Sequence, residues 1–284
     1  MPTLLDIRRR IRSVKSTQQI TRAMKMVAAA RLRGAQERIF NARPYANQML
    51  TLLSSLAART EQRTHPLLAE RPVEKVLLVL ITADRGLCGA FNTNLLRAAQ
   101  NYLEENQQRQ VSVIAVGRKG RDHYRKSPVK LAGEYVGVFS RLNFSHAQEV
   151  AKLIIDQYTQ QDVDAVDFLY NEFKSILSQR VRVERYLPIK PLQPAQGEAL
   201  IDYIYEQPPA EIFSALLPRY VEIEVYRALL ESQAAELAAK MTAMDAATNN
   251  AAEMIDSLTL HMNRVRQAAI TREIIEVVSG AAGV

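Results

Sequence analysis

"LLDIRRRIRSVKSTQQITRAMKMVAAARL", residues 4–32, carries the repeat that decides the fold. Steps of alternately three and four residues from Leu4 to Leu56 meet apolar side chains at thirteen of sixteen positions. The same stepping from Leu230 to Ala269 meets a polar side chain only at Thr248. Because an apolar repeat of 3.5 residues keeps one stripe of a helix facing a partner helix, each end of the chain is predicted to form a coiled-coil helix.

Small residues in this stretch predict a thin shaft. Ala28, Ala29 and Ala30 let two helix axes approach closely, and Met24, Val27 and Leu32 are expected to supply the larger contacts. An ordinary helical bundle is the alternative. Length argues against a bundle, because at 1.5 Å per residue the N-terminal helix spans roughly 80 Å and the C-terminal helix about 105 Å.

The ends of the two helices have their own signals. Thr3 with Asp6 predicts a capping box at the start, Pro44 a kink, and Ser279 with Gly280 a C-terminal stop. The expected domains are an N-terminal coiled-coil helix over 1–59, an α/β domain over 73–190 and a C-terminal coiled-coil helix over 209–280.

The middle of the chain changes period and alternates strand and helix patterns. The predicted strands are Val73–Thr82, Val111–Val116, Ala165–Tyr170 and Val181–Leu187, and the predicted helices are Phe91–Glu105 and Ser145–Tyr158. This alternation is typical of a largely parallel sheet. The fold class expected is α+α/β: a long antiparallel coiled coil of the N- and C-terminal helices with an inserted Rossmann-like α/β domain.

Positive charge is concentrated at the start of the chain. Residues 1–43 hold eleven Arg or Lys against two acids, a net charge of +9, whereas the rest of the chain has 26 basic against 28 acidic residues. A partner of negative potential is implied: nucleic acid, anionic lipid or an acidic protein. A basic coiled-coil nucleic-acid-binding or scaffold protein is therefore the alternative function, although no aromatic residue precedes Phe40 to stack on bases.

Composition also bears on location. Val76–Ile81 is the longest uninterrupted apolar run, too short to cross a bilayer, and the early arginines are not followed by the apolar core of a signal peptide. The single Cys88 cannot form an internal disulfide. A reducing, cytoplasm-side location is expected.

No catalytic or metal-binding set is apparent in the sequence. Gly86 and Gly89 follow a predicted strand, but their spacing fits neither dinucleotide- nor P-loop-type phosphate cradles. A structural turn is the better interpretation, with Asp84 and Arg85 paired or capping the next helix and Cys88 buried. The four histidines lack metal-ligand spacing, so neither metal nor cofactor is expected.

Three segments together resemble a known family. Residues 4–32, "ITADRGLCGAFNTNL" (81–95) and "NRVRQAAITREIIEVVSGAA" (263–282) resemble the γ subunit of F-type ATP synthases, of bacterial type because the inserted cysteine pair of plant-type relatives is missing. The resemblance implies a non-catalytic rotor shaft that couples proton-driven c-ring rotation to catalytic sites on β subunits. The implied partners are the α and β subunits of the α3β3 ring, the ε subunit and the c-ring, with no nucleic acid. The implied location is peripheral, on the cytoplasmic face of the cell inner membrane, with membrane association only through the complex.

The resemblance also implies contact residues. Alignment of the two helices at the domain end leaves the C-terminal helix about 25 Å longer, so its apolar tip would stand alone as a bearing. Residues carried over from the family are Met24 and Lys25 in "ITRAMKMV" and Arg266, Gln267, Thr271 and Glu273 in "VRQAAITRE"; the tip adds Ile274, Ile275, Val277 and Val278.

Overall fold

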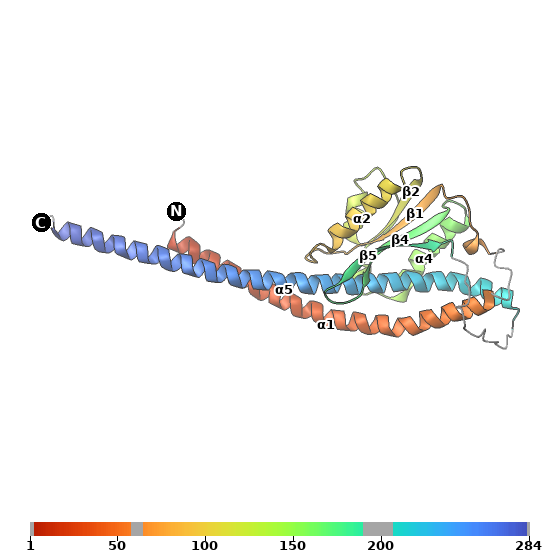
Figure 1. Cartoon of the computed structure of the whole chain (residues 1–284), viewed down its shortest axis with the longest axis horizontal. Coiled ribbons are helices and arrows are strands. Elements are labelled where there is room, and N and C mark those ends of the chain that lie inside the picture. The colour runs from red at the N-terminus through yellow and green to blue at the C-terminus, as the bar shows by residue number, and fades with distance from the viewer. Residues whose placement is uncertain (1–2, 58–64, 190–206, 283–284) are drawn as a thin grey trace. The chain divides into compact units, whose positions relative to one another are not determined.

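The computed structural model of the chain describes residues 3–57, 65–189 and 207–282. The chain forms two compact units, residues 1–29 with 240–284 and residues 30–239. Two long helices, α1 (Leu4–Ala57) and α5 (Pro209–Ala282), each contribute to both units (Figure 1). The predicted limits at residues 59 and 190 lie outside the described residues.

The first unit is an antiparallel pair of helices, made by the start of α1 and the end of α5. Lys25 Nζ lies 2.5 Å from Asp245 Oδ1, and the hydroxyl oxygens of Thr21 and Thr248 lie 2.8 Å apart. Going back four residues on α1 thus means advancing three on α5, so the helices run in opposite directions. Ile7 is buried in this unit, as the 3.5-residue repeat predicts.

The end of α5 continues past the start of α1. By the register of the two cross-helix pairs, Leu4 lies opposite about residue 265, and the remaining turns of α5 extend roughly 25 Å. Figure 1 shows the C-terminal end of α5 beyond the N-terminus. After Ala269 every described side chain of α5 is exposed, so the predicted single-helix tip is confirmed.

The starts of both long helices agree with the sequence: α1 begins at the predicted capping box, and α5 begins at Pro209. Asp6 N donates to Thr3 Oγ1 at 3.2 Å and Thr3 N donates to Asp6 Oδ2 at 3.1 Å, which is the predicted capping box. The hydrogen bonds from Thr3 lower the pKa of Asp6. The predicted stop at Ser279 is wrong: α5 reaches Ala282, because the Ser279 hydroxyl bonds the Ile275 carbonyl within the helix and Gly280 needs no left-handed turn.

The second unit contains a five-stranded sheet in the order β3-β2-β1-β4-β5. Strands β3, β2, β1 and β4 are parallel, and β5 pairs antiparallel with β4. The fold class predicted from sequence is thus confirmed. In chain order the elements are β1 (Lys75–Ile81), α2 (Phe91–Glu105), β2 (Gln110–Val116), α3 (Arg118–Tyr124), β3 (Lys130–Tyr135), α4 (Phe144–Thr159), β4 (Ala165–Phe173) and β5 (Gln179–Leu187), with 3-10 turns at Pro66–Leu68 and Val138–Ser140.

Sequence patterns located most of these elements. Helix α2 has the predicted bounds, and α4, β1, β2, β4 and β5 begin and end within three residues of the prediction. Helix α3 and strand β3 were not predicted. The first is only seven residues long and contains Gly120, and the second is a half-exposed edge strand that lacks a clean apolar alternation.

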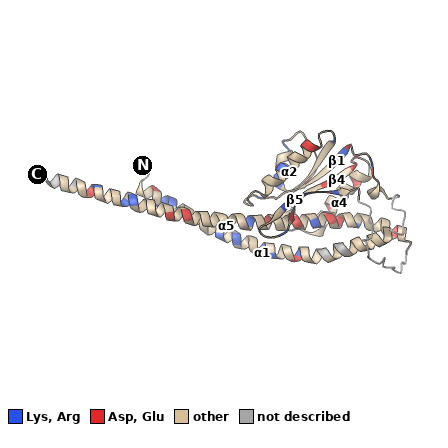
Figure 2. Ribbon diagram, in the orientation of Figure 1, with Lys and Arg blue, Asp and Glu red and all other residues tan. Residues whose placement is uncertain are grey.

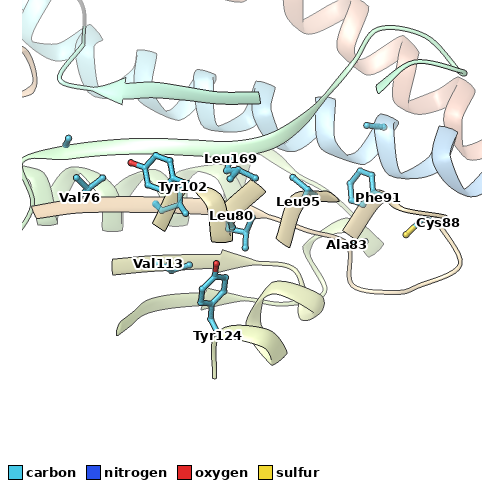
Figure 3. Packing of buried hydrophobic residues seen from close by; sticks show 14 residues of the cluster. Val76, Leu80, Ala83, Cys88, Phe91, Leu95, Tyr102, Val113, Tyr124 and Leu169 are labelled. Atoms are coloured by element: carbon cyan, nitrogen blue, oxygen red, sulfur yellow. The ribbon is translucent and has the colours of Figure 1, made fainter. Parts of the chain in front are cut away.

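The core of the sheet forms around β1. From Val76 to Ile81 every residue of β1 is fully buried, because the strand is central and both its faces are covered. Leu80 packs in one cluster with Leu95 of α2 and Leu169 of β4 (Figure 3). Each such leucine contributes roughly 1.5 to 3 kcal/mol by burial, which gives the second unit a rigid centre.

Gly117→Ala should destabilise the second unit by about 2 to 4 kcal/mol. Gly117 has φ of +97°, and an added Cβ would lie 2.1 Å from the Thr82 carbonyl oxygen. Thermal unfolding of the full chain measures the change. Gly34→Ala in α1 is the matched control: no atom lies within 4 Å of its Cβ, and the helix should gain about 0.5 to 1 kcal/mol. Equal stability of Gly117→Ala and wild type would contradict this account.

Candidate functional site

The residues predicted to contact partners all fall in the first unit, on both of its helices. Met24 and Lys25 are partly buried within the coil, whereas the predicted contacts on α5 are exposed. The exposed set is Arg266, Gln267, Thr271, Glu273, Ile274 (57% exposed), Ile275 (61%) and Val278 (62%). The end of α5 therefore presents polar side chains followed by apolar ones.

Lys25 has a partner within the chain. Its ammonium pairs with the Asp245 carboxylate, and the two side chains are 41% and 46% exposed. An ion pair this open to water stabilises the coil by only about 1 kcal/mol or less. Lys25 can therefore exchange Asp245 for a carboxylate on another protein at little cost.

Thr21 and Thr248 form a polar layer next to this ion pair. Their hydroxyl oxygens lie 2.8 Å apart, and the Thr248 hydroxyl also lies 2.7 Å from the Met244 carbonyl oxygen. Apolar side chains at these positions would pack in several registers with similar energy. A hydrogen bond between two core positions instead favours the register that brings them together.

Sequence reasoning missed a second set of apolar side chains on the first unit. Val27 was expected to pack between the helices but is 53% exposed, and Ala30 is also exposed, so only Ala28 of the three alanines is buried in the interface. The sequence does indicate this exposure, because these residues fall outside the alternating steps of three and four residues that mark the helix interface. The exposed members are Leu5, Ile20, Met26 and Val27 on α1 and Met254, Leu260 and Ile270 on α5.

Basic side chains are interspersed with these apolar ones on α1. The exposed arginines are Arg8, Arg9, Arg10, Arg12 and Arg22. Figure 2 shows the Lys and Arg positions of α1 in blue. Exposed apolar residues at this density are typical of a surface that a partner covers. The first unit thus offers both hydrophobic contacts and positive charge to a surrounding surface.

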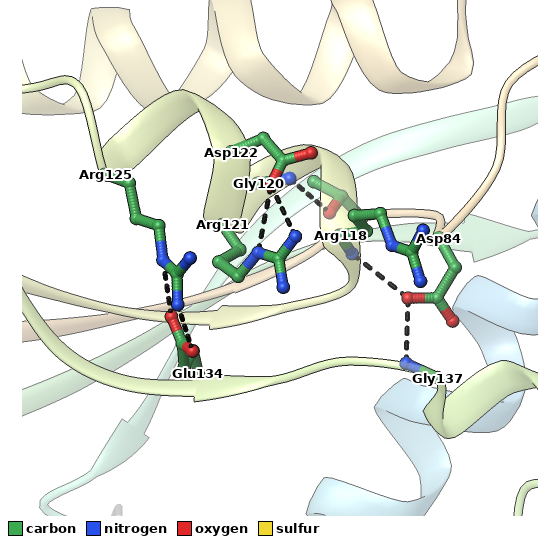
Figure 4. A network of polar contacts seen from close by, with 9 residues as sticks. Asp84, Arg118, Gly120, Arg121, Asp122, Arg125, Glu134 and Gly137 are labelled. Atoms are coloured by element: carbon green, nitrogen blue, oxygen red, sulfur yellow. Dashed lines mark hydrogen bonds and ion pairs between the residues drawn. The ribbon is translucent and has the colours of Figure 1, made fainter.

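The turn after β1 is a structural connection. Asp84 Oδ1 accepts hydrogen bonds from Arg118 N at 3.1 Å and Gly137 N at 3.0 Å (Figure 4). These two amides follow β2 and β3, so one carboxylate ties the carboxyl ends of three neighbouring strands. Nucleotide phosphates bind at this edge of other α/β sheets. Here the protein's own carboxylate takes the donors that a phosphate would need.

The sequence predicts that Asp84 and Arg85 pair or cap the next helix, α2. The Asp84 carboxylate accepts from the first backbone amide of α3, and near the start of α2 it is Asn92 whose Oδ1 accepts from Ala83 N at 3.0 Å. Cys88 is 1% exposed, as predicted. It accepts a hydrogen bond from Asn92 Nδ2 at 3.2 Å, which fits a packing role for the thiol.

A cavity of about 360 Å³ lies between α1, α4 and α5 in the second unit. Its described lining residues are mostly apolar, and the one charged residue among them, Arg227, is paired with Glu224 at 2.5 Å. Within the described ranges, no group of three or more His, Cys, Asp or Glu side chains could hold a metal ion. The lining residues are Ile39, Ala42, Tyr45, Phe144, Ile223, Tyr226, Arg227 and Leu230.

Comparison with known proteins decides the family. The profile of the ATP synthase family matches residues 3–284. A relative named ATP synthase gamma chain from Solibacter usitatus (strain Ellin6076) is 53% identical, over 99% of both chains. The chain belongs to the ATP synthase γ chain family. Another γ chain, from Desulfitobacterium hafniense (strain DSM 10664 / DCB-2), is 51% identical over 99% of both chains.

Solved structures agree with this family. A chain from the central stalk and c-ring of the Tetrahymena thermophila mitochondrial ATP synthase superposes with a TM-score of 0.63 at 28% identity, covering 80% of this chain and 99% of that one. A chain of the Euglena gracilis mitochondrial enzyme shares the fold, with a TM-score of 0.70 at 19% identity over 99% of this chain and 94% of that one. None of the helices in the described part of this γ-family chain has the length and apolar character to span a bilayer.

Lys25→Asp should weaken the coil by about 1 kcal/mol, because it places two carboxylates at one level, and the double variant with Asp245→Lys should recover most of this loss. Thermal unfolding at low and high salt measures both effects, and the difference should shrink in high salt. Lys15→Asp, at an exposed position of the same helix, is the matched control. Failure of the double variant to recover stability would show that the pair makes no contribution.

Proposed function

We propose that this chain is the central rotor shaft of an F1Fo ATP synthase and couples proton-driven c-ring rotation to conformational changes at the catalytic sites of an α3β3 ring. The observation that carries the proposal is the single-helix end of α5, with Ile274, Ile275 and Val278 each more than half exposed. Such a tip is a liability in water unless a partner surrounds it. The subunit itself is non-catalytic, and ATP is made or hydrolysed on partner β subunits.

Asymmetry of the shaft is the basis of coupling. The first unit has two different helices, so a ring of three equivalent sites meets a different set of side chains at each site for any angle of the shaft. A rod changes nucleotide affinity at a site only by the difference in its contact energy between the states of that site. A 10⁴-fold change in affinity requires about 5.5 kcal/mol, which a few contacts supply.

Apolar and polar contacts of the shaft have different roles in rotation. The apolar tip acts as a bearing, because hydrophobic contacts are non-directional and leave few specific bonds to break as the shaft turns. Polar residues before the tip, Gln267 and Thr271 among them, form angle-dependent hydrogen bonds with the ring. Lys25 and the exposed arginines of α1 face acidic loops of the β subunits, and Met24 adds an apolar contact beside them.

The other partners meet the α/β domain in the middle of the chain. The domains proposed are residues 1–59 and 209–280 for the coiled coil and 73–190 for the α/β domain, which contacts the ε subunit and the c-ring. The complex holds the chain at the cytoplasmic face of the cell inner membrane. A role as a nucleic-acid-binding or scaffold protein does not fit membership of this family.

Cross-linking of the shaft to its ring should stop ATP hydrolysis by the assembled complex. Met26→Cys offers an exposed thiol on α1, whereas the native Cys88 is 1% exposed and does not compete. Oxidation to a disulfide with a cysteine introduced into a β subunit should abolish turnover at all three sites, and reduction should restore it. Full turnover by the cross-linked complex would exclude rotation of this chain.

Met24→Lys should impair coupling more than assembly. A second ammonium next to Lys25 strengthens the attraction of the shaft to the acidic ring surface at some rotation angles, and this hinders release of the shaft from that surface. Proton pumping per ATP hydrolysed by membrane vesicles should fall several-fold, while the amount of assembled complex stays the same. Met24→Leu, of similar volume without charge, is the matched control. Unchanged pumping in Met24→Lys would show that Met24 makes no angle-dependent contact.

A further inference from the structure

Polar side chains connect one stretch of α5 to several elements of the second unit. Glu231 Oε2 accepts from Phe173 N, at the end of β4, at 3.0 Å. Gln233 Nε2 donates to the Phe139 carbonyl, in the turn after β3, at 3.1 Å. Nine residues before Glu231, Glu222 Oε2 accepts from Gln148 Nε2 of α4 at 3.3 Å.

The two central side chains of this stretch are buried. Glu231 is 7% exposed and Gln233 is 6% exposed, within a run of α5 that is buried at every position from Ala228 to Ala238. Stability alone would favour leucine at such sites, because a buried polar group recovers its desolvation cost only through good hydrogen bonds. The Gln233 Oε1 atom is buried without a hydrogen-bond partner in the described part of the chain. Its desolvation therefore lowers the stability of the folded chain.

The positions of these side chains around the helix suit resistance to turning. At 100° per residue, Glu231 and Gln233 lie about 200° apart around α5, and they bond to two different elements, β4 and the turn after β3. Apolar contacts are non-directional, so they favour one angle of a buried helix only through the fit of its side chains. Hydrogen bonds on two sides define one angle, and Glu222, about 13 Å further along the axis, adds a second level.

We propose that Glu231 and Gln233 are positioning residues that lock α5 at one angle against the α/β sheet, so that torque received by the sheet domain turns the helix without slip. The inference rests on the proposed rotor function and adds the place where torque enters the shaft. Neither residue contacts nucleotide. Each acts through a backbone group of the sheet domain, the Phe173 amide at the end of β4 and the Phe139 carbonyl in the turn after β3.

The test measures coupling and stability in the same variants of the assembled complex. Gln233→Leu should keep or raise the thermal stability of the full chain and leave ATP hydrolysis intact, yet lower proton pumping per ATP by about twofold or more. Single-molecule recordings should show wider angular fluctuation of the shaft relative to the sheet domain. Glu231→Gln keeps an acceptor for Phe173 N and should retain coupling, whereas Glu231→Leu should lose it.

Two controls separate the outcomes. Glu211→Leu changes an exposed acid in the first turn of the same helix and should pump like wild type. Gln148→Leu removes only the contact with Glu222, on a side chain near the surface, and should give a smaller loss of coupling without a folding defect. Normal pumping in Gln233→Leu and Glu231→Leu, in a complex that the Met26 cross-link still arrests, would overturn this inference while leaving the rotor function standing.

Discussion

The narrow antiparallel contact between the start of α1 and the end of α5 is the constraint on which the functional surface depends. Ala28 and Ile7 fill it with little bulk, and the hydroxyls of Thr21 and Thr248 fix its register. A wider interface would bury more side chains and leave fewer for a partner. Because the stripe is narrow, Ile20, Met26 and Val27 remain outside it. The same packing that makes the coil thin therefore creates its contact surface.

The sheet domain meets the opposite requirement, since it has to be rigid. Strand β1 is fully buried from Val76 to Ile81, and Asp84 joins the ends of β1, β2 and β3 through two backbone amides. A carboxylate at that edge strengthens the connection and removes the vacant amide donors that nucleotide binding requires. The fold thus keeps a Rossmann-like topology while using its usual ligand edge for structure. Polar contacts then transfer that rigidity to α5.

Local patterns predicted the parts of the structure that depend on local sequence. The apolar repeat predicted both long helices and their pairing, and β1 and α2 followed from a buried run and an amphipathic helix. Strand β3 was missed because its stability comes from pairing with β2 rather than from its own sequence. The contacts of Asp84, Glu231 and Gln233 join residues 34 to 94 positions apart, and no periodicity encodes such pairs. The family resemblance implied the tip contacts, and geometry added the exposed apolar residues of the coil.

Stability and function favour different side chains at three places along α5. Beyond Ala269 the helix exposes apolar side chains, which cost solubility until a partner covers them. At Thr248 and Asp245 it places polar groups in a two-helix contact where apolar ones would pack more tightly. At Glu231 and Gln233 it buries polar groups against the sheet. A helix selected for stability alone would have none of the three. Each departure occurs where a rotating rod needs a different property: low friction at the tip, a fixed register in the coil and a fixed angle where torque enters.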